Sequence, residues 1–174
     1  MDVYYFSRGV TQEFLDNARD KENPEGPVRF TTALVGPWDF LAVLDVEDGD
    51  FEAVKDLLSD LNQAGGDTGA RPSDSTTAIA VAHGRYVIKR RRIMAFAAFV
   101  LIRVQRTPVR EIFAELDHLD GYEGSAIVDG GFDILVELGA ERYGDLRERL
   151  AATRALIEGR GRAEVCYQVR RREY

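Results

Sequence analysis

Two aspartates, Asp39 and Asp133, each follow a glycine turn and an aromatic residue, and they are the side chains best placed to meet a ligand. Each stands at the expected start of a strand, three residues after a glycine, Gly36 or Gly130, that permits a tight turn. A carboxylate there could pair with the amino group of a small molecule. It could equally cap its own turn, as aspartate often does. We take Gly36, Asp39, Gly130 and Asp133 as candidate ligand-binding residues and leave both roles open.

The other reactive side chains form no catalytic or metal-binding pattern. His83 and His118 are the only histidines, and no carboxylate stands at a metal-ligand spacing from either. The single cysteine, Cys166, lies in an apolar segment and is expected to be a buried structural thiol. We therefore expect no catalytic residue, no metal site and no cofactor.

Two further features are given ordinary explanations. The basic run Lys89–Arg92 could contact phosphate, but solvated charge or pairing with the acidic first half of the chain is the favoured interpretation. The segment Gly65–Gly69 lacks the Gly-Lys-Ser/Thr ending of a phosphate-binding loop, so we expect a flexible loop.

The second half of the chain has the clearest periodicity. Residues 95–105 are apolar and of strand length, and Thr107-Pro108 is typical of a helix start, with Thr107 as the cap. Apolar residues then recur at helical spacing up to Gly121, and residues 132–138 alternate as a strand does. The order β-α-β-β-α-β is completed by a strand at 125–128, a helix at 146–157 and a strand at 163–169.

The first half repeats this order more loosely. Strands are expected at 3–6, 28–35, 38–46 and 76–82, with helices at 11–18 and, capped by Asp50, at 51–61. Residues 33–43 superimpose without gaps on residues 127–137, at an offset of 94 residues, which predicts an internal repeat. Alternation places Trp38 and Phe132 on the helix side of their strands.

The repeated turns carry a resemblance to a known family. Gly130-Gly131-Phe132-Asp133 is similar to the glycine-x-aromatic-aspartate turn of the Lrp/AsnC ligand-sensing (RAM) domain, and Gly36-Pro37-Trp38-Asp39 matches the same pattern. Residues 116–122 and 157–164 also resemble that domain. The resemblance covers almost all of residues 95–172 and, more faintly, residues 28–82. It implies sheets packed face to face in pairs, further assembly into rings, and small effectors bound near the turn, with the glycine backbone lining the pocket.

The expected fold class is α+β. We predict two tandem ferredoxin-like βαββαβ modules packed sheet to sheet, as a pseudo-dimer of the dimeric α/β-barrel type. The first, degenerate module spans 1–82, a linker spans 83–94 and the second module spans 95–174. Leu41, Val43 and Leu135 would lie on the sheet faces that must be covered, and fusion makes their pairing intramolecular.

Composition and charge limit the partners. Residues 1–82 hold 6 Lys/Arg against 16 Asp/Glu, a net charge of −10, and residues 83–174 hold 17 against 14, a net charge of +3. The two halves therefore attract each other, whereas an acidic chain is a poor non-specific binder of nucleic acid. No apolar run reaches the roughly 18 residues of a membrane span, and the first residues do not resemble a signal peptide. We expect a cytoplasmic protein.

The leading functional expectation is an effector-sensing, transcription-regulator-like protein of Lrp/AsnC type. It would bind a small metabolite such as an amino acid and act as a dimer or tetramer of chains, or through a helix-turn-helix regulator as partner. Full-length family members begin with a helix-turn-helix domain, whereas here every helical pattern is followed by a strand, so direct DNA binding is not expected.

Two alternatives remain open. The first is a small α/β-barrel enzyme of monooxygenase or haem-binding type, although neither histidine is expected on a strand face. The second is an interaction module without a ligand.

Overall fold

The fold, seen in a computed structural model, is α+β, and the structure describes residues 1–23, 25–64, 71–86, 88 and 94–169. The basic run Lys89–Arg92 and the segment Gly65–Gly69 lie outside the described residues. The elements are β1 (Asp2–Arg8), α1 (Gln12–Asp20), β2 (Val28–Val35), β3 (Phe40–Asp45), α2 (Phe51–Asn62), β4 (Asp74–His83), β5 (Phe96–Val104), α3 (Val109–Leu116), β6 (Tyr122–Gly130), β7 (Ile134–Ala140), α4 (Tyr143–Ile157) and β8 (Gly161–Gln168).

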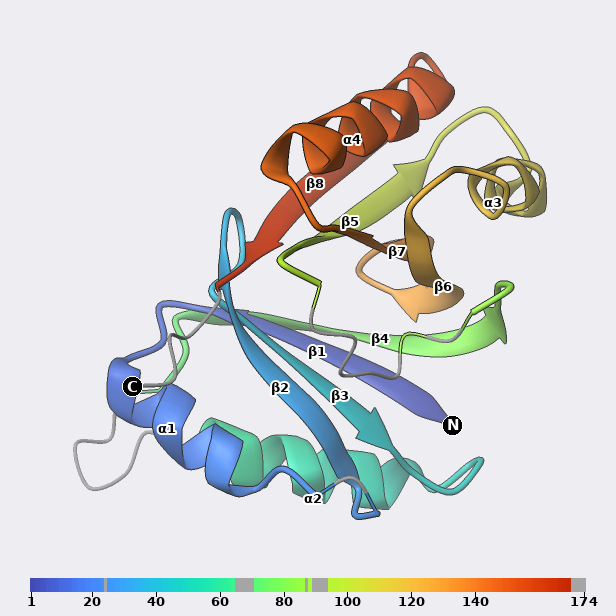
Figure 1. Cartoon of the computed structure of the whole chain (residues 1–174). Coiled ribbons are helices and arrows are strands. Elements are labelled where there is room, and N and C mark those ends of the chain that lie inside the picture. Colours follow the sequence, from blue (N-terminus) through green and yellow to red (C-terminus); the bar gives the residue numbers. More distant parts are fainter. Residues whose placement is uncertain (24, 65–70, 87, 89–93, 170–174) are drawn as a thin grey trace.

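The eight strands pair antiparallel and close on themselves in the order β1-β3-β2-β8-β5-β7-β6-β4 (Figure 1). The order β4-β1-β3-β2 in the first half matches the order β8-β5-β7-β6 in the second half. The halves therefore meet along two equivalent seams, β2–β8 and β4–β6. The β4–β6 seam is paired from Ala78–Gly130 to His83–Ala126, whereas the β2–β8 seam is paired only at Leu34–Gln168 and Val35–Tyr167. We call the closed arrangement the barrel.

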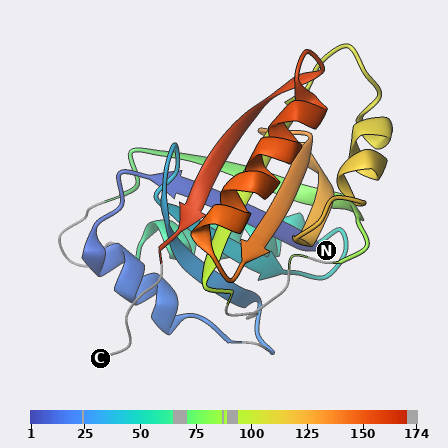
Figure 2. The same ribbon diagram turned by 45° about the horizontal axis from the view of Figure 1, so that its top comes forward.

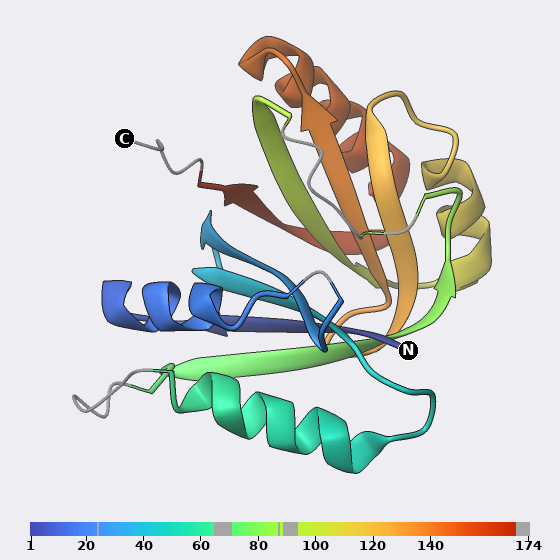
Figure 3. The same cartoon turned by 60° about the horizontal axis from the view of Figure 1, so that its bottom comes forward.

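The helices lie on the outside of the two sheets. Helices α1 and α2 cover the outer face of the first-half strands, and α3 and α4 cover the second-half strands (Figure 3). Helix α4 packs on β5, β7 and β8, as a second view shows (Figure 2). None of the helices in the described part of the chain is long and apolar enough to cross a membrane.

The buried apolar side chains form three cores. Two outer cores lie between helices and sheet, one in each half. The third, which we call the central core, is enclosed by strands of both halves and contains the predicted Leu41, Val43 and Leu135. Because each fully buried Leu or Phe side chain contributes about 1.5–3 kcal/mol, the central core holds the two halves together.

The predicted repeat reappears in the hydrogen bonds around the two glycine turns. In each half the aspartate N–H donates to a carbonyl of the first strand, and its C=O accepts from the second strand. These bonds are Asp39 N to Ser7 O (3.0 Å), Leu34 N to Asp39 O (2.7 Å), Asp133 N to Ile102 O (2.9 Å) and Val128 N to Asp133 O (2.9 Å). The two halves therefore share their local geometry as well as their element order.

The helix starts agree with the sequence at some positions and differ at one. Asp50 caps α2 by accepting from the N–H of Ala53 (3.0 Å), as predicted. Thr107 was predicted to cap α3, and this is wrong: Pro108 is the N-cap and no side-chain cap forms. The threonine stands one residue too early to reach the free N–H groups of the first turn.

Candidate functional site

The two glycine turns lie at the same end of the barrel, which we call the turn end. Gly36 and Gly130 have φ of +146° and +145°, in the region that favours glycine. A Cβ on Gly36 would lie closer than 3.0 Å to the carbonyl oxygen of Val165, and one on Gly130 would lie closer still to that of Thr77. Each glycine is therefore required both by its turn and by the strand of the opposite half that passes over it.

The carboxylates of Asp39 and Asp133 perform the same structural task in each half. Oδ2 of Asp39 accepts from the backbone N–H of Gly9 (2.6 Å), and Oδ2 of Asp133 accepts from that of Val104 (2.7 Å). Both bonds hold the chain where the first strand of a half ends, at Gly9 after β1 and at Val104, the last residue of β5. The other oxygen of each half-buried carboxylate accepts no hydrogen bond from the described residues, so it remains available to a ligand.

Trp38 and Phe132 were predicted to face the helices, and this is wrong. Both rings contact Phe6 inside the barrel, at centroid distances of 6.3 Å for Trp38 and 5.7 Å for Phe132. The strands begin only at Phe40 and Ile134, so the aromatic residues belong to the turns and do not follow the strand alternation. They fill the turn end with aromatic side chains.

Polar groups of the same turn end surround Trp38. Its indole N–H donates to Glu164 of the other half (3.1 Å). The guanidinium of Arg8 lies 5.7 Å from the indole centroid and forms an ion pair with Asp74 (2.6 Å). Glu164, Arg8 and Asp74 are therefore already engaged in contacts with one another or with Trp38.

The opposite end of the barrel, which we call the linker end, holds two polar side chains in the central core. Tyr4 on β1 is fully buried, and its hydroxyl has no hydrogen-bond partner among the described residues. Glu137 on β7 is half-buried and stands directly opposite Phe99, a member of the central core, so both point inward. Ile88, from the segment that joins the halves, is buried in the same core.

Burial controls the electrostatics of the linker end. Burial raises the pKa of Tyr4, and the charges of Asp2 and Glu137 raise it further. Burial, and then repulsion by Glu123, raises the pKa of Glu137 to about 7. Carboxyl groups whose pKa is raised in this way by burial and a neighbouring charge are often found in functional sites.

One of the two histidines differs from its predicted place. His83 ends β4, so the expectation that neither histidine lies on a strand is wrong, and its Nε2 is 3.2 Å from Oδ2 of Asp2. Pairing with β6 extends the strand one residue beyond the periodic pattern. His118 is exposed and lies two residues past the end of α3. In the described part of the chain, no group of three or more His, Cys, Asp or Glu side chains could hold a metal ion.

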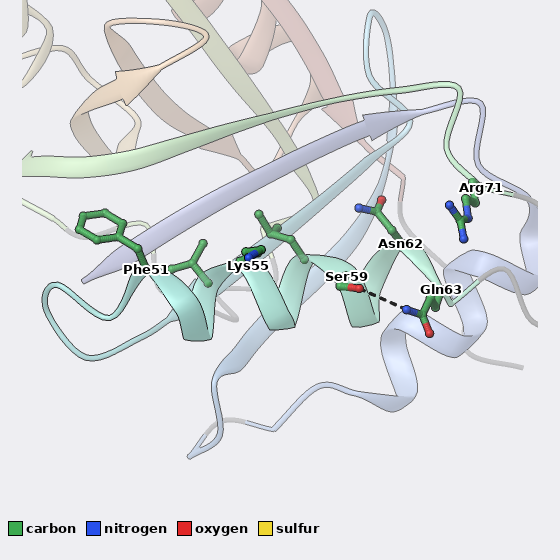
Figure 4. A pocket seen from close by; sticks show the side chains of 8 residues that line it. Phe51, Lys55, Ser59, Asn62, Gln63 and Arg71 are labelled. Carbon is green, nitrogen blue, oxygen red and sulfur yellow. Dashed lines mark hydrogen bonds between the residues drawn. The ribbon is translucent and has the colours of Figure 1, made fainter.

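A buried cysteine and a surface groove are two further candidate sites. Cys166 is fully buried in the central core, and burial raises the pKa of its thiol to about 11, which agrees with an inert structural role. An open groove runs along α2 beside Arg71, between the exposed ring of Phe51 and Gln63 (Figure 4). Gln63 there donates to the hydroxyl of Ser59 (3.2 Å), and none of the described residues that line the groove carries a buried polar atom without a hydrogen-bond partner.

Sequence reasoning did not single out Tyr4 and Glu137. The repeat offered a signal, because the structure places Tyr4 where the second half has Phe99, and Glu137 where the first half has Val43. A tyrosine and a glutamate thus each replace an apolar side chain on one copy only. Comparison of the two copies, position by position, points to both.

Comparisons with known proteins show the fold and no family. No model of a known protein family matches the chain, and no curated protein sequence matches it either. One similar solved structure is a major regulator of staphylococcal pathogenesis, with a TM-score of 0.51 and 11% identity over 98% of this chain and 100% of that one. Another is an anthrone oxidase-like protein, with a TM-score of 0.52 and 9% identity over 97% of this chain and 90% of that one. At these identities the likeness concerns the fold alone.

Proposed function

We propose that this chain is an effector-sensing regulatory protein of Lrp/AsnC type, built from two fused ferredoxin-like modules. One chain would then correspond to one dimer of sensing modules. The observation that carries the proposal is the duplicated glycine-x-aromatic-aspartate turn, with the same hydrogen bonds in both halves. The similar fold of a regulator of staphylococcal pathogenesis agrees with it.

The turn offers a small effector a specific set of contacts. One oxygen of Asp39 or Asp133 is held by a backbone N–H, which fixes the carboxylate, and the other oxygen is left for an ammonium group. Gly36 and Gly130 are exposed, so the turn backbone is accessible. An amino acid, with an ammonium and a carboxylate, is the class of effector that we propose.

The proposed mode of action takes account of the order of helices and strands in the described residues. Every described helix is followed by a strand, so no helix-turn-helix occurs in the described residues. We propose that the protein acts by forming dimers or tetramers of chains, or by engaging a separate helix-turn-helix regulator.

Calorimetric titration with the twenty amino acids tests the proposal. Asp39→Asn and Asp133→Asn keep an oxygen that can accept the backbone hydrogen bond but remove the charge, so binding should fall at least tenfold while the melting temperature changes little. Light scattering with and without the ligand then reports assembly. If no amino acid binds, or if both variants bind as the natural protein does, the turn is purely structural and the proposal fails.

A small barrel enzyme is the second candidate, and the linker end favours it. A glutamate with a raised pKa of about 7 and a buried tyrosine are groups that can serve general acid–base catalysis at neutral pH. The similar fold of an anthrone oxidase-like protein agrees with this candidate. A Soret absorbance band in the purified protein would support the haem-binding version, and its absence together with amino-acid binding at the turn would support the regulator.

A further inference from the structure

We propose that the groove along α2 binds a carboxylic acid with an apolar tail, with the carboxylate at Arg71 and the tail along the helix towards Phe51. The groove lies on the helix side of the first half, outside the barrel, and is lined by none of the residues of the glycine turns. The inference therefore goes beyond the proposed function and stands whether or not an amino acid binds at the turns.

The first argument is the size and shape of the groove. Its volume is about 440 Å³, which lies within the range of about 300–1,000 Å³ that is common for small-molecule sites. The groove follows α2 from Phe51, the first residue of the helix, to Asn62, the last. Because an α-helix rises about 1.5 Å per residue, these two positions are roughly 16 Å apart along the helix axis. Such a groove suits an elongated ligand better than a compact one.

The second argument is the charge of the lining. Residues 1–82 hold 16 Asp/Glu against 6 Lys/Arg, yet two of these cations, Lys55 and Arg71, and no acidic residue of the described chain line the groove. Lys55 already forms an ion pair with Glu52 (3.5 Å). Arg71 forms no ion pair and no hydrogen bond with a described residue. The guanidinium of Arg71 is therefore the charge that is left to attract an anion.

The third argument is the set of uncharged donors near Arg71. The hydroxyl of Tyr5 donates to Oδ1 of Asn62, and no described residue accepts from the amide nitrogen of Asn62, which can therefore donate to a ligand. The hydroxyl of Ser59 accepts from Gln63 (3.2 Å), which leaves its own proton for another acceptor. Asn62, Gln63 and Arg71 gather at one end of the groove (Figure 4). A carboxylate at this end meets one guanidinium and neutral donors.

The charge balance selects a carboxylate over a phosphate. One guanidinium can hold both oxygens of a carboxylate in two parallel hydrogen bonds. The end of α2 that lies here is its carbonyl end, which carries a partial charge of about −0.5. The full positive charge of Arg71 outweighs this partial charge for a ligand with one negative charge. A phosphate group, with a charge of about −1.5 to −2, would need a second free cation.

The fourth argument is the apolar lining towards the start of α2. Phe51, Val54 and Leu58 follow one another at spacings of three and four residues, so they share one side of the helix, and all three line the groove. The ring of Phe51 is 61% exposed, so most of its apolar surface is open to a ligand. A tail that covers these side chains removes apolar surface from water, which favours binding. A small anion without a tail leaves this surface exposed.

The test uses the full chain and sodium octanoate, below its micelle concentration, as the probe. Calorimetry at pH 7.5 and constant ionic strength should detect one site per chain. Acetate has the head group without the tail, and octanamide has the tail without the charge, so each should bind about tenfold more weakly than octanoate or less well still. Equal binding of octanoate and octanamide would leave Arg71 without a role and would overturn the proposal.

Variants of exposed residues locate the two ends of the ligand. Arg71→Gln should weaken octanoate binding about tenfold, because it removes a pair of charge-assisted hydrogen bonds, and Phe51→Ala should weaken it several-fold. Lys55→Gln should weaken it by less than about twofold. Arg19→Gln, at an exposed arginine of α1, is the matched control for a lost positive charge and should leave binding unchanged. Asp133→Asn should also have no effect, which separates this groove from the proposed effector site.

Several results would overturn the proposal. They are binding that survives Arg71→Gln, a larger loss with Lys55→Gln than with Arg71→Gln, an unchanged affinity in Phe51→Ala, and no binding up to about 10 mM octanoate. The backbone amide shifts that octanoate changes in nuclear magnetic resonance spectra give an independent location. They should be centred on α2 and Arg71, and changes centred on the glycine turns would assign octanoate to the effector site instead.

Discussion

The titration of Glu137 should make the protein less stable as the pH rises through neutrality. Burial and Glu123 raise the pKa of Glu137 from its ordinary 4.5 to about 7 in the folded protein. Below pH 4.5 the group is protonated in the folded and in the unfolded chain. Between 4.5 and about 7 only the folded chain keeps the proton, so the free energy of unfolding falls by about 1.4 kcal/mol per pH unit. Above pH 7 the loss is complete.

The full range corresponds to about 3 kcal/mol, and because Glu137 is only half-buried we expect about 2 kcal/mol between pH 5 and pH 8. Glu137→Gln cannot ionise, so its stability should lack this decline. Urea unfolding followed by circular dichroism at pH 5, 6, 7 and 8 measures both proteins. Glu148→Gln, at an exposed position on α4, is the matched control and should follow the natural protein. Parallel pH profiles for the natural protein and Glu137→Gln would refute the inward placement of this carboxylate.

Three further predictions concern the turn end and the central core. Gly130→Ala should destabilise the protein by more than about 2 kcal/mol in urea unfolding, because the new methyl group meets a backbone carbonyl and φ is +145°; Gly144→Ala, with nothing within 4 Å on α4, should cost nothing or stabilise. Asp39→Ala and Asp133→Ala should each cost about 1–2 kcal/mol and add in the double variant, since each breaks one equivalent hydrogen bond; a large difference between them would contradict the repeat. The thiol of Cys166 should resist alkylation at pH 8 until the protein unfolds, and rapid labelling of the folded protein would contradict its burial.

The order of the elements was predictable because its signals are local. Alternation, helical spacing and turn glycines act over a few residues, and they predicted all eight strands and four helices in the described chain, with ends displaced by a few residues. The predicted strand at residues 28–35 begins and ends where β2 does, and Asp50 caps α2 as predicted. The repeat at an offset of 94 residues then implied that both halves share one topology.

Features that depend on contacts between the halves were less accessible. Alternation fails at Trp38 because the turn, and not the strand, sets its direction. His83 is drawn into β4 by pairing with β6, a contact between segments more than forty residues apart. The burial of Tyr4 in the central core depends on how the two sheets face each other, and no local pattern encodes that arrangement. The candidate turn residues were identified, and their backbone contacts were revealed only by the structure.

Covalent fusion of the two copies removes a constraint that identical subunits cannot escape. In a symmetric homodimer, every residue facing the axis occurs twice, so a glutamate at the position of Glu137 would bring a second negative charge into the same apolar interior. Here the equivalent position of the other copy carries Val43, so this position contributes one carboxylate instead of two. Joining two copies in one chain therefore allows an asymmetric interior that separate identical chains could not build.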